Sequence, residues 1–272
     1  MHLLISHDTV YHYDAPLARS TQYLRLTPRP TPGQRVLRWQ LSLPAPASAS
    51  EDAYGNTLHV LTLDGPRREI HLLASGEVDT DDGPAQPEPD GRWPAAIFLR
   101  DSALTRADAA LSAFAQGFAN ACRADPRAGL QALMQALGER MPYHHGQTDA
   151  ATPAAEAFAG GLGVCQDHAH VFICCARLLG LPARYVSGYL AADSAHVAIH
   201  AWAEVRLSEG WLGWDVANQC MANGRHVRLA YGADYLDACP VRGVRQGGGS
   251  EALRARVEVR PGPGAAVQDQ QQ

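Results

Sequence analysis

The stretch GGLGVCQDHAHV, residues 160–171, combines a glycine-rich turn, a cysteine and the start of a helix. From about residue 164 to 179 apolar residues recur at helical spacing, and Gly180 and Pro182 then end the helix. Cys165 is therefore expected in the first helical turn. Unpaired backbone N–H groups and the positive end of the helix dipole stabilise a thiolate at such a position. We interpret Cys165 as a candidate nucleophile.

A histidine and an aspartate follow at positions that suit such a cysteine. A thiol nucleophile requires a base, and the base requires a group that orients it. His200 opens the expected strand HAWAEV, and Asp215 ends the expected strand GWLGWD. A helix packed against two adjacent strands could bring the three side chains together. A single histidine near a tryptophan is more often a structural residue, so the spacing alone leaves that interpretation open.

The surrounding residues predict an α+β core over residues 95–260, in which helices are followed by a sheet. Ala and Leu at helical spacing predict one helix over residues 104–122, and Asp125-Pro126 begins another that ends near Gly138. Four later segments have the composition of strands: 184–189, 201–207, 211–216 and 255–259. The nucleophile helix is expected to pack on this antiparallel sheet.

Residues 1–78 predict a small antiparallel β domain. Segments with strand composition are 2–13, 34–41 and 58–63, with turn signals at Gly55-Asn56 and Asp64-Gly65. Residues 79–94 are acidic and rich in Pro and Gly, and are expected to form an exposed linker. Residues 261–272 are expected to form a flexible tail.

The composition limits the function classes. The chain has 272 residues, a net charge of −5 and a pI near 6.2, which argue against nucleic acid or an anionic membrane as its main partner. It shows no secretory signal and no apolar run of about 18 residues, so a reduced, cytoplasmic setting is expected. The six cysteines are then expected to be free thiols, with Cys174 and Cys175 buried as packing residues. All 23 basic residues are arginine.

Three blocks of sequence, in this order, resemble the bacterial transglutaminase-like family, which belongs to the papain-like cysteine superfamily. They are GVCQD (163–167), LGLPARYVSGY (179–189) and HAWAEV (200–205). Three earlier blocks resemble the β-rich bacterial transglutaminase-like N-terminal region: YHYD (11–14), LRLTPR (24–29) and DAYGN (52–56). The resemblance covers nearly the whole chain. It implies a papain/transglutaminase-like catalytic core, preceded by that small antiparallel β domain.

The resemblance also implies a mechanism, in which Cys165 is the nucleophile, His200 the general acid and base, and Asp215 the orienting carboxylate. The reaction would be acyl transfer on a carboxamide or peptide carbonyl through a thioester, with a protein or peptide substrate and, for transfer, a small amine as acceptor. The chain departs from the family pattern at two places. Asp-Val-Ala-Asn (215–218) replaces Asp-Pro-Thr-Asn, and Gly-Ala-Asp-Tyr (232–235) replaces Gly-Arg-Asp-Tyr.

Four further residues near these blocks are candidates for the substrate cleft: Gly163, Asp167, Trp202 and Asn218. Asp167 also lies in the first helical turn, where an acid is favoured in any helix. Asn218 is a second candidate for orienting His200. The backbone N–H of Cys165 is one expected oxyanion donor, and no second donor is identified.

The histidines raise the alternative of a metal site: His168, His170, His196 and His200. His196 and His200 are four residues apart, but their segment is expected to be a loop entering a strand, and the chain contains no Cys-x-x-Cys pair. The sequence also lacks a calcium-binding EF-hand loop and a phosphate-binding loop. No metal and no cofactor are therefore expected.

Two alternatives to acyl transfer remain open. One is a cysteine peptidase or amidase of the same fold, and the other is a non-catalytic binding module that retains the three polar residues without using them. A thioester is resolved by an amine or by water with the same catalytic residues, so the sequence does not choose between transfer, deamidation and proteolysis. The oligomeric state is also left open.

Overall fold

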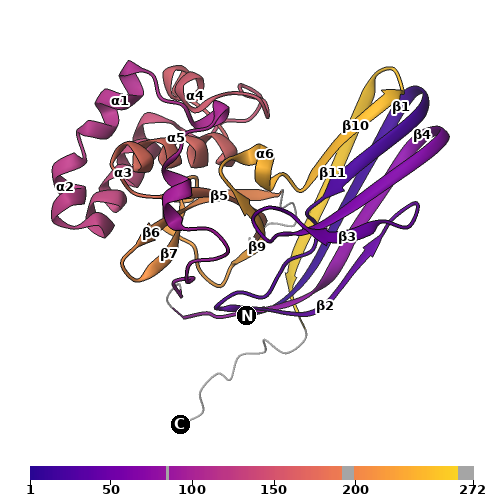
Figure 1. The fold of residues 1–272 in the computed structure, drawn as a ribbon, viewed down its shortest axis with the longest axis horizontal. Coiled ribbons are helices and arrows are strands. Elements are labelled where there is room, and N and C mark those ends of the chain that lie inside the picture. The colour runs from indigo at the N-terminus through magenta and orange to yellow at the C-terminus, as the bar shows by residue number, and fades with distance from the viewer. Residues whose placement is uncertain (84–85, 192–198, 263–272) are drawn as a thin grey trace, which may run out of the picture.

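The computed structural model describes residues 1–83, 86–191 and 199–262. A long antiparallel sheet forms one half of the molecule, and a second sheet covered by helices forms the other (Figure 1). The expected α+β class is confirmed. Most of the expected tail, 263–272, lies outside the described residues. Within the described ranges, no helix is both long enough and apolar enough to cross a membrane.

Two long strands form the centre of the first sheet. β1 (His2–Leu24) and β4 (Thr57–Thr80) pair in antiparallel fashion over most of their lengths. The other strands of this sheet are β2 (Gln34–Ser42) and β3 (Ser48–Glu51), which pair with β4, and β10 (Val241–Gly247) and β11 (Glu251–Pro261), which pair with β1. In Figure 1 the yellow end of the chain therefore lies beside the indigo beginning.

This sheet differs from the expected one in two respects. β10 and β11 belong to it, although they fall inside the range 95–260 expected for the core. Their partner β1 is more than 200 residues away in the sequence, so no local pattern indicates the pairing. Asp64-Gly65 is not a turn between strands, because β4 continues through it. Gly65 instead takes a left-handed φ of 91° close to an irregularity in the pairing with β1.

The second sheet has the strand order β8-β7-β6-β5-β9. Its strands are β5 (Ala183–Leu190), β6 (His200–Leu207), β7 (Gly210–Asp215), β8 (Cys220–Met221) and β9 (His226–Gly232). Helix α5 (Cys165–Leu178) packs on it, because alternate side chains of β6, including Ala203 and Val205, join the buried apolar face of the helix. The expected helix-on-sheet core is therefore present.

The remaining helices are the 3₁₀ turns η1 (Ala95–Leu99) and η2 (Ala103–Thr105), and the helices α1 (Ala109–Gln116), α2 (Ala119–Ala124), α3 (Pro126–Arg140), α4 (Ala154–Gly160) and α6 (Tyr235–Ala238). Of these, four pack directly against α5, namely η2, α1, α3 and α4, whereas η1, α2 and α6 pack on other elements. The single helix expected over residues 104–122 is divided into η2, α1 and α2. Asp108 caps the start of α1, and α1 stops before Gly117. α3 begins as expected, with Asp125 accepting hydrogen bonds from the first-turn N–H groups.

The segment expected as an exposed linker is anchored to the second sheet by buried charges. Glu88 pairs with Arg184 of β5 and Arg228 of β9, and both arginines also pair with Glu204 of β6. The Arg184 guanidinium lies 4.3 Å from the ring centre of Trp211. All four charged side chains are at most 13% exposed, so removing one would leave an uncompensated charge in the interior.

Candidate active site

The start of α5 is fixed by a side chain that folds back onto it. Asp167 Oδ2 accepts hydrogen bonds from the backbone N–H of Val164, at 2.8 Å, and from the Thr148 hydroxyl, at 2.7 Å. A Cβ added at Gly163 would lie 2.6 Å from the Asp167 Cβ, so a glycine is required there. Cys165 lies between these residues as the first residue of the helix. The glycine and the aspartate of GVCQD therefore fix the helix start that has the cysteine as its first residue.

Cys165 is accessible, unlike the other two cysteines of its helix. It is a free thiol of intermediate exposure, whereas Cys174 and Cys175 are buried. Burial raises the pKa of Cys174 to about 12 and that of Cys175 well above its ordinary value. The expectation that these two are packing thiols is confirmed, and Cys165 is left as the reagent-accessible thiol of α5.

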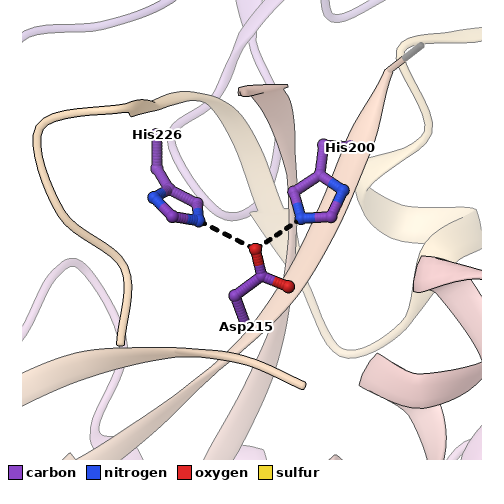
Figure 2. Close-up of side chains that lie close together, drawn as sticks. All are labelled: His200, Asp215 and His226. Atoms are coloured by element: carbon purple, nitrogen blue, oxygen red, sulfur yellow. Dashed lines mark hydrogen bonds and ion pairs between the residues drawn. The ribbon is translucent and has the colours of Figure 1, made fainter. Parts of the chain in front are cut away.

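His200 and Asp215 lie side by side at the ends of their strands, as Figure 2 shows. His200 Nε2 lies 2.7 Å from Asp215 Oδ2, and the carboxylate is fully buried. Cys165 is near enough to His200 to be one of the groups that raise the pKa of the imidazole. Because Nε2 is engaged by Asp215, Nδ1 is the ring nitrogen that remains for the thiol. The structure thus brings together the three side chains that the sequence singled out.

The electrostatics of this group favour a charged imidazole. Burial by itself lowers the pKa of His200, but interactions with Asp215 and Cys165 outweigh burial and raise this pKa to about 10. Burial likewise opposes ionisation of Asp215, yet hydrogen bonds from His200 and His226 hold its pKa well below the usual range. At neutral pH the arrangement is therefore an imidazolium beside a carboxylate.

Asn218 supports the carboxylate from the turn that follows β7. Its side-chain Nδ2 donates to Asp215 Oδ2 at 2.8 Å, and its backbone N–H donates to Oδ1 at 3.2 Å. The same Nδ2 lies 3.3 Å from His200 Nε2, which is farther than Asp215 Oδ2. Of the two candidates for orienting the imidazole, Asp215 makes the shorter contact, and Asn218 holds Asp215.

His226 is a member of this group that no local sequence pattern indicates. It opens β9, is buried, and its Nε2 lies 2.9 Å from Asp215 Oδ2 (Figure 2). In the sequence it lies in Gly-Arg-His-Val, which matches no catalytic or metal-binding motif. Its proximity to Asp215 depends on the tertiary arrangement of the strands.

In the part of the chain that the structure describes, the group of side chains that could hold a cation differs from the histidines considered in the sequence. His168 is hydrogen-bonded to the carbonyl groups of Val164 and Met141, and His196 lies outside the described residues. Among the described residues, one nitrogen or oxygen from each of His200, Asp215 and His226 lies within 4.8 Å of the others, close enough to hold a cation. In this structure Asp215 Oδ2 is hydrogen-bonded to Nε2 of His200 and to Nε2 of His226.

Tyr143 lies beside the segment that leads into α5. Its backbone pairs with Gly163, and its ring stacks on His168 with the ring centres 6.1 Å apart. Its hydroxyl is near enough to Cys165 for the cysteine to influence its pKa, and the side chain is about half exposed. A surface depression of about 460 Å³ begins at Tyr143 and is bordered by Val216, next to Asp215.

Three of the four expected cleft residues are buried and contact the site residues from the protein interior. Trp202 is 2% exposed and stacks on His200 at 6.2 Å between ring centres, so it supports the imidazole and does not face a substrate. Gly163 and Asp167 are buried at the helix start. Asn218 alone of the four is exposed. A tryptophan near a catalytic histidine can face either side of a sheet, which strand periodicity alone does not decide.

Comparison with known proteins agrees with this architecture. Residues 3–79 match the bacterial transglutaminase-like N-terminal region, and residues 112–216 match the transglutaminase-like superfamily. An uncharacterized Mycobacterium tuberculosis protein is 30% identical, over 88% of this chain and 86% of its own length. An uncharacterized Mycobacterium leprae protein is 27% identical, over 94% of this chain and 97% of its own.

A solved structure has the same fold. The crystal structure of a Cytophaga hutchinsonii protein, provisionally described as a cysteine protease, has a TM-score of 0.76 and 21% identity. The match covers 96% of this chain and 90% of that one. The family resemblance and the papain-like fold expected from the sequence are thereby confirmed.

Proposed function

The chain belongs to the transglutaminase-like superfamily, and from that membership we propose that it is a cysteine-dependent enzyme acting on carboxamide or peptide carbonyls through a thioester. One observation carries the proposal: an accessible thiol at a helix N-terminus lies near an imidazole that a buried carboxylate holds by a hydrogen bond. A binding module has no need of this arrangement, because it would gain nothing from an imidazolium between a thiol and an acid.

The proposed first step forms the thioester. The Cys165 thiolate attacks the carbonyl carbon, and the oxyanion that develops is stabilised by the backbone N–H of Cys165. The second donor in this proposal is the hydroxyl of Tyr143, a half-exposed residue whose backbone pairs with Gly163 just before Cys165. His200 then gives its proton to the departing ammonia or amine, and the C–N bond breaks.

The second step resolves the thioester. His200, now neutral, accepts a proton from an incoming amine or water as that molecule attacks, and the thiolate leaves. An amine gives a new amide and water gives a free acid, so transglutamination, deamidation and proteolysis share one intermediate. The substrate proposed for all three is a protein or peptide. Because the chain contains no lysine, it offers no ε-amine for cross-linking to itself.

Selective alkylation tests the proposal at the nucleophile. Cys165 should react with iodoacetamide near neutral pH at least about tenfold faster than Cys220, the other thiol of intermediate exposure. Burial raises the pKa of Cys220, which makes it a suitable internal control. Peptide mass spectrometry gives both rates in one sample. Equal rates would remove the basis for an activated nucleophile.

Incubation with a peptide mixture and a primary amine label then separates the three outcomes. Label on glutamine indicates transfer, an increase of about one mass unit indicates deamidation, and new chain termini indicate proteolysis. Cys165→Ala is the matched control, since it removes the sulfur and leaves the site otherwise intact. None of the three changes, or changes that persist in this variant, would refute the proposed activity.

A further inference from the structure

The protonation state of His226 follows from its partners. The backbone N–H of Asn223 donates to His226 Nδ1 at 3.1 Å, which is shorter than the 3.4 Å from Nδ1 to Asn223 Oδ1, and the shorter contact assigns a lone pair to this nitrogen. In a neutral ring the proton is then on Nε2, which points at Asp215 Oδ2 at 2.9 Å. His226 therefore donates to the carboxylate, in the tautomer that the turn before β9 selects.

Three donors converge on one carboxylate oxygen. Asp215 Oδ2 accepts from His200 at 2.7 Å, Asn218 at 2.8 Å and His226 at 2.9 Å. His200 changes its charge and its contacts during the proposed reaction, and Asn218 belongs to the same turn as Asp215. His226 comes from β9, which the strand order separates from β7 by β6 and β5. It therefore connects the carboxylate to a strand that is not adjacent to β7.

Asp215 is the carboxylate that contacts the His226 ring. His226 also borders a cavity of about 80 Å³, together with Asp81, Glu204 and Arg228. Glu204 and Arg228 pair with each other. The ring is also held edge-on to Trp202, with the ring centres 5.2 Å apart, and His200 lies 6.1 Å away.

We propose that His226 is a positioning residue, which holds the Asp215 carboxylate in the orientation and ionised state that it needs to orient His200. This inference rests on the proposed function and adds a fourth side chain to the series from Cys165 through His200 to Asp215. Without the His226 donor, only His200 and Asn218 donate to Asp215 Oδ2. The orientation of the carboxylate, and with it that of the His200 ring beside the thiolate, is then less well fixed.

Two substitutions test the role. His226→Leu removes the donor at similar volume, whereas His226→Gln keeps an N–H group at about the reach of Nε2. The measurement is the rate of iodoacetamide alkylation of Cys165 between pH 5 and 10, with thermal unfolding in parallel. His226→Leu should lower the rate near pH 6 by about tenfold or more and shift the midpoint of the profile to higher pH by about one unit. His226→Gln should restore most of the loss.

The matched control is His7→Leu. His7 is likewise buried and is hydrogen-bonded to Tyr189 at 3.1 Å and Thr9 at 3.0 Å, but lies outside the site. It should lower the unfolding temperature without moving the alkylation profile, as a purely structural histidine would.

The possible outcomes separate this inference from the proposed function. A His226→Leu profile that superimposes on that of the unmodified protein overturns the positioning role while Cys165 remains activated. Stoichiometric metal in the purified protein, lost in His226→Leu, assigns the cluster to a cation and also overturns it. An unmodified protein whose Cys165 shows no enhanced reactivity refutes the proposed function itself.

Discussion

Asp167 Oδ2 lies 2.8 Å from the backbone nitrogen of Val164, immediately before the candidate nucleophile. The carboxylate therefore closes the first turn of α5 around Cys165, and Thr148 holds it from the side. The helix N-terminus that favours a thiolate is thus built by a residue that never faces the substrate. Helix capping and nucleophile placement depend on the same carboxylate.

Replacing this carboxylate should affect both properties. Asp167→Ala removes the acceptor for Val164 and Thr148 and should lower the free energy of unfolding by about 1–2 kcal/mol, as the loss of a helix cap does. Alkylation of Cys165 should slow in parallel. Asp167→Asn retains an acceptor oxygen and is the matched control, with a smaller loss in urea denaturation. Full stability in the alanine variant would contradict the capping role.

Tyr143→Phe separates oxyanion stabilisation from thiol activation. Reaction with p-nitrophenyl acetate passes through an oxyanion, whereas alkylation by iodoacetamide does not. Loss of the hydroxyl should therefore slow acylation of Cys165 by about 100-fold and leave alkylation unchanged. Tyr23→Phe, at an exposed tyrosine of the first sheet, should change neither rate. Equal acylation rates in Tyr143→Phe and the unmodified protein would exclude the hydroxyl as a donor.

His200 should contribute stability that depends on pH in a defined direction. Its pKa is raised from 6.5 to about 10 in the folded state, so the folded state holds the proton more tightly than the unfolded chain. The contribution is complete below pH 6.5 and is lost as the pH rises through about 10. The stability difference between the unmodified protein and His200→Gln should therefore shrink between pH 7 and 10, as followed by urea denaturation. A constant difference would contradict the raised pKa.

His170 should act in the opposite direction. Burial, and secondarily the charge of Arg177, lower its pKa to about 3, so it is neutral when folded and protonated when unfolded at acidic pH. Its contribution is present above pH 6.5 and is lost as the pH falls toward 3. His170→Gln keeps an acceptor for the Tyr235 N–H and should flatten the loss of stability between pH 6 and 4. His12→Gln, at an exposed histidine, should leave the slope unchanged.

Glu204 should prove structural although it lies in the HAWAEV block beside His200. Its carboxylate is 3% exposed and pairs with Arg184 and Arg228. Glu204→Gln leaves both buried arginines short of a partner and should cost about 3–5 kcal/mol in unfolding free energy. Asp101→Asn breaks an exposed ion pair with Arg106 and should change stability by less than about 0.5 kcal/mol. Similar changes in the free energy of unfolding for the two substitutions would show that the buried ion pairs contribute no more to stability than the exposed one.

The parts of the fold that could be predicted are those with local chemical causes. Asp125-Pro126 begins α3 because a capping side chain and a fixed proline φ act over three residues. The cysteine, histidine and aspartate could be chosen because each stands in a family block at an element boundary. β10 and β11 could not be assigned to the first sheet, because strand pairing over more than 200 residues leaves no periodic pattern.

His226 and Tyr143 could not be predicted from the sequence, for the same physical reason. Each reaches the site through a contact between distant elements, and each belongs to a residue type that is usually structural. Only the strand order β7-β6-β5-β9 and the bridge between Tyr143 and Gly163 bring them there. The residues that the sequence identifies are those that carry out the chemistry, whereas those that orient them depend on the tertiary arrangement.

The pairing of β1 with β10 and β11 also sets an order of assembly during synthesis. β1 and β4 can join as soon as residue 80 has emerged, but the outer edge of β1 stays unpaired until the last strands are made. The second sheet is complete shortly before that, because β9 ends at Gly232 and β10 begins at Val241. An open strand edge is a site of aggregation. Shortening the chain before Val241 would therefore expose that edge permanently, and insolubility would result even with every residue of the candidate active site in place.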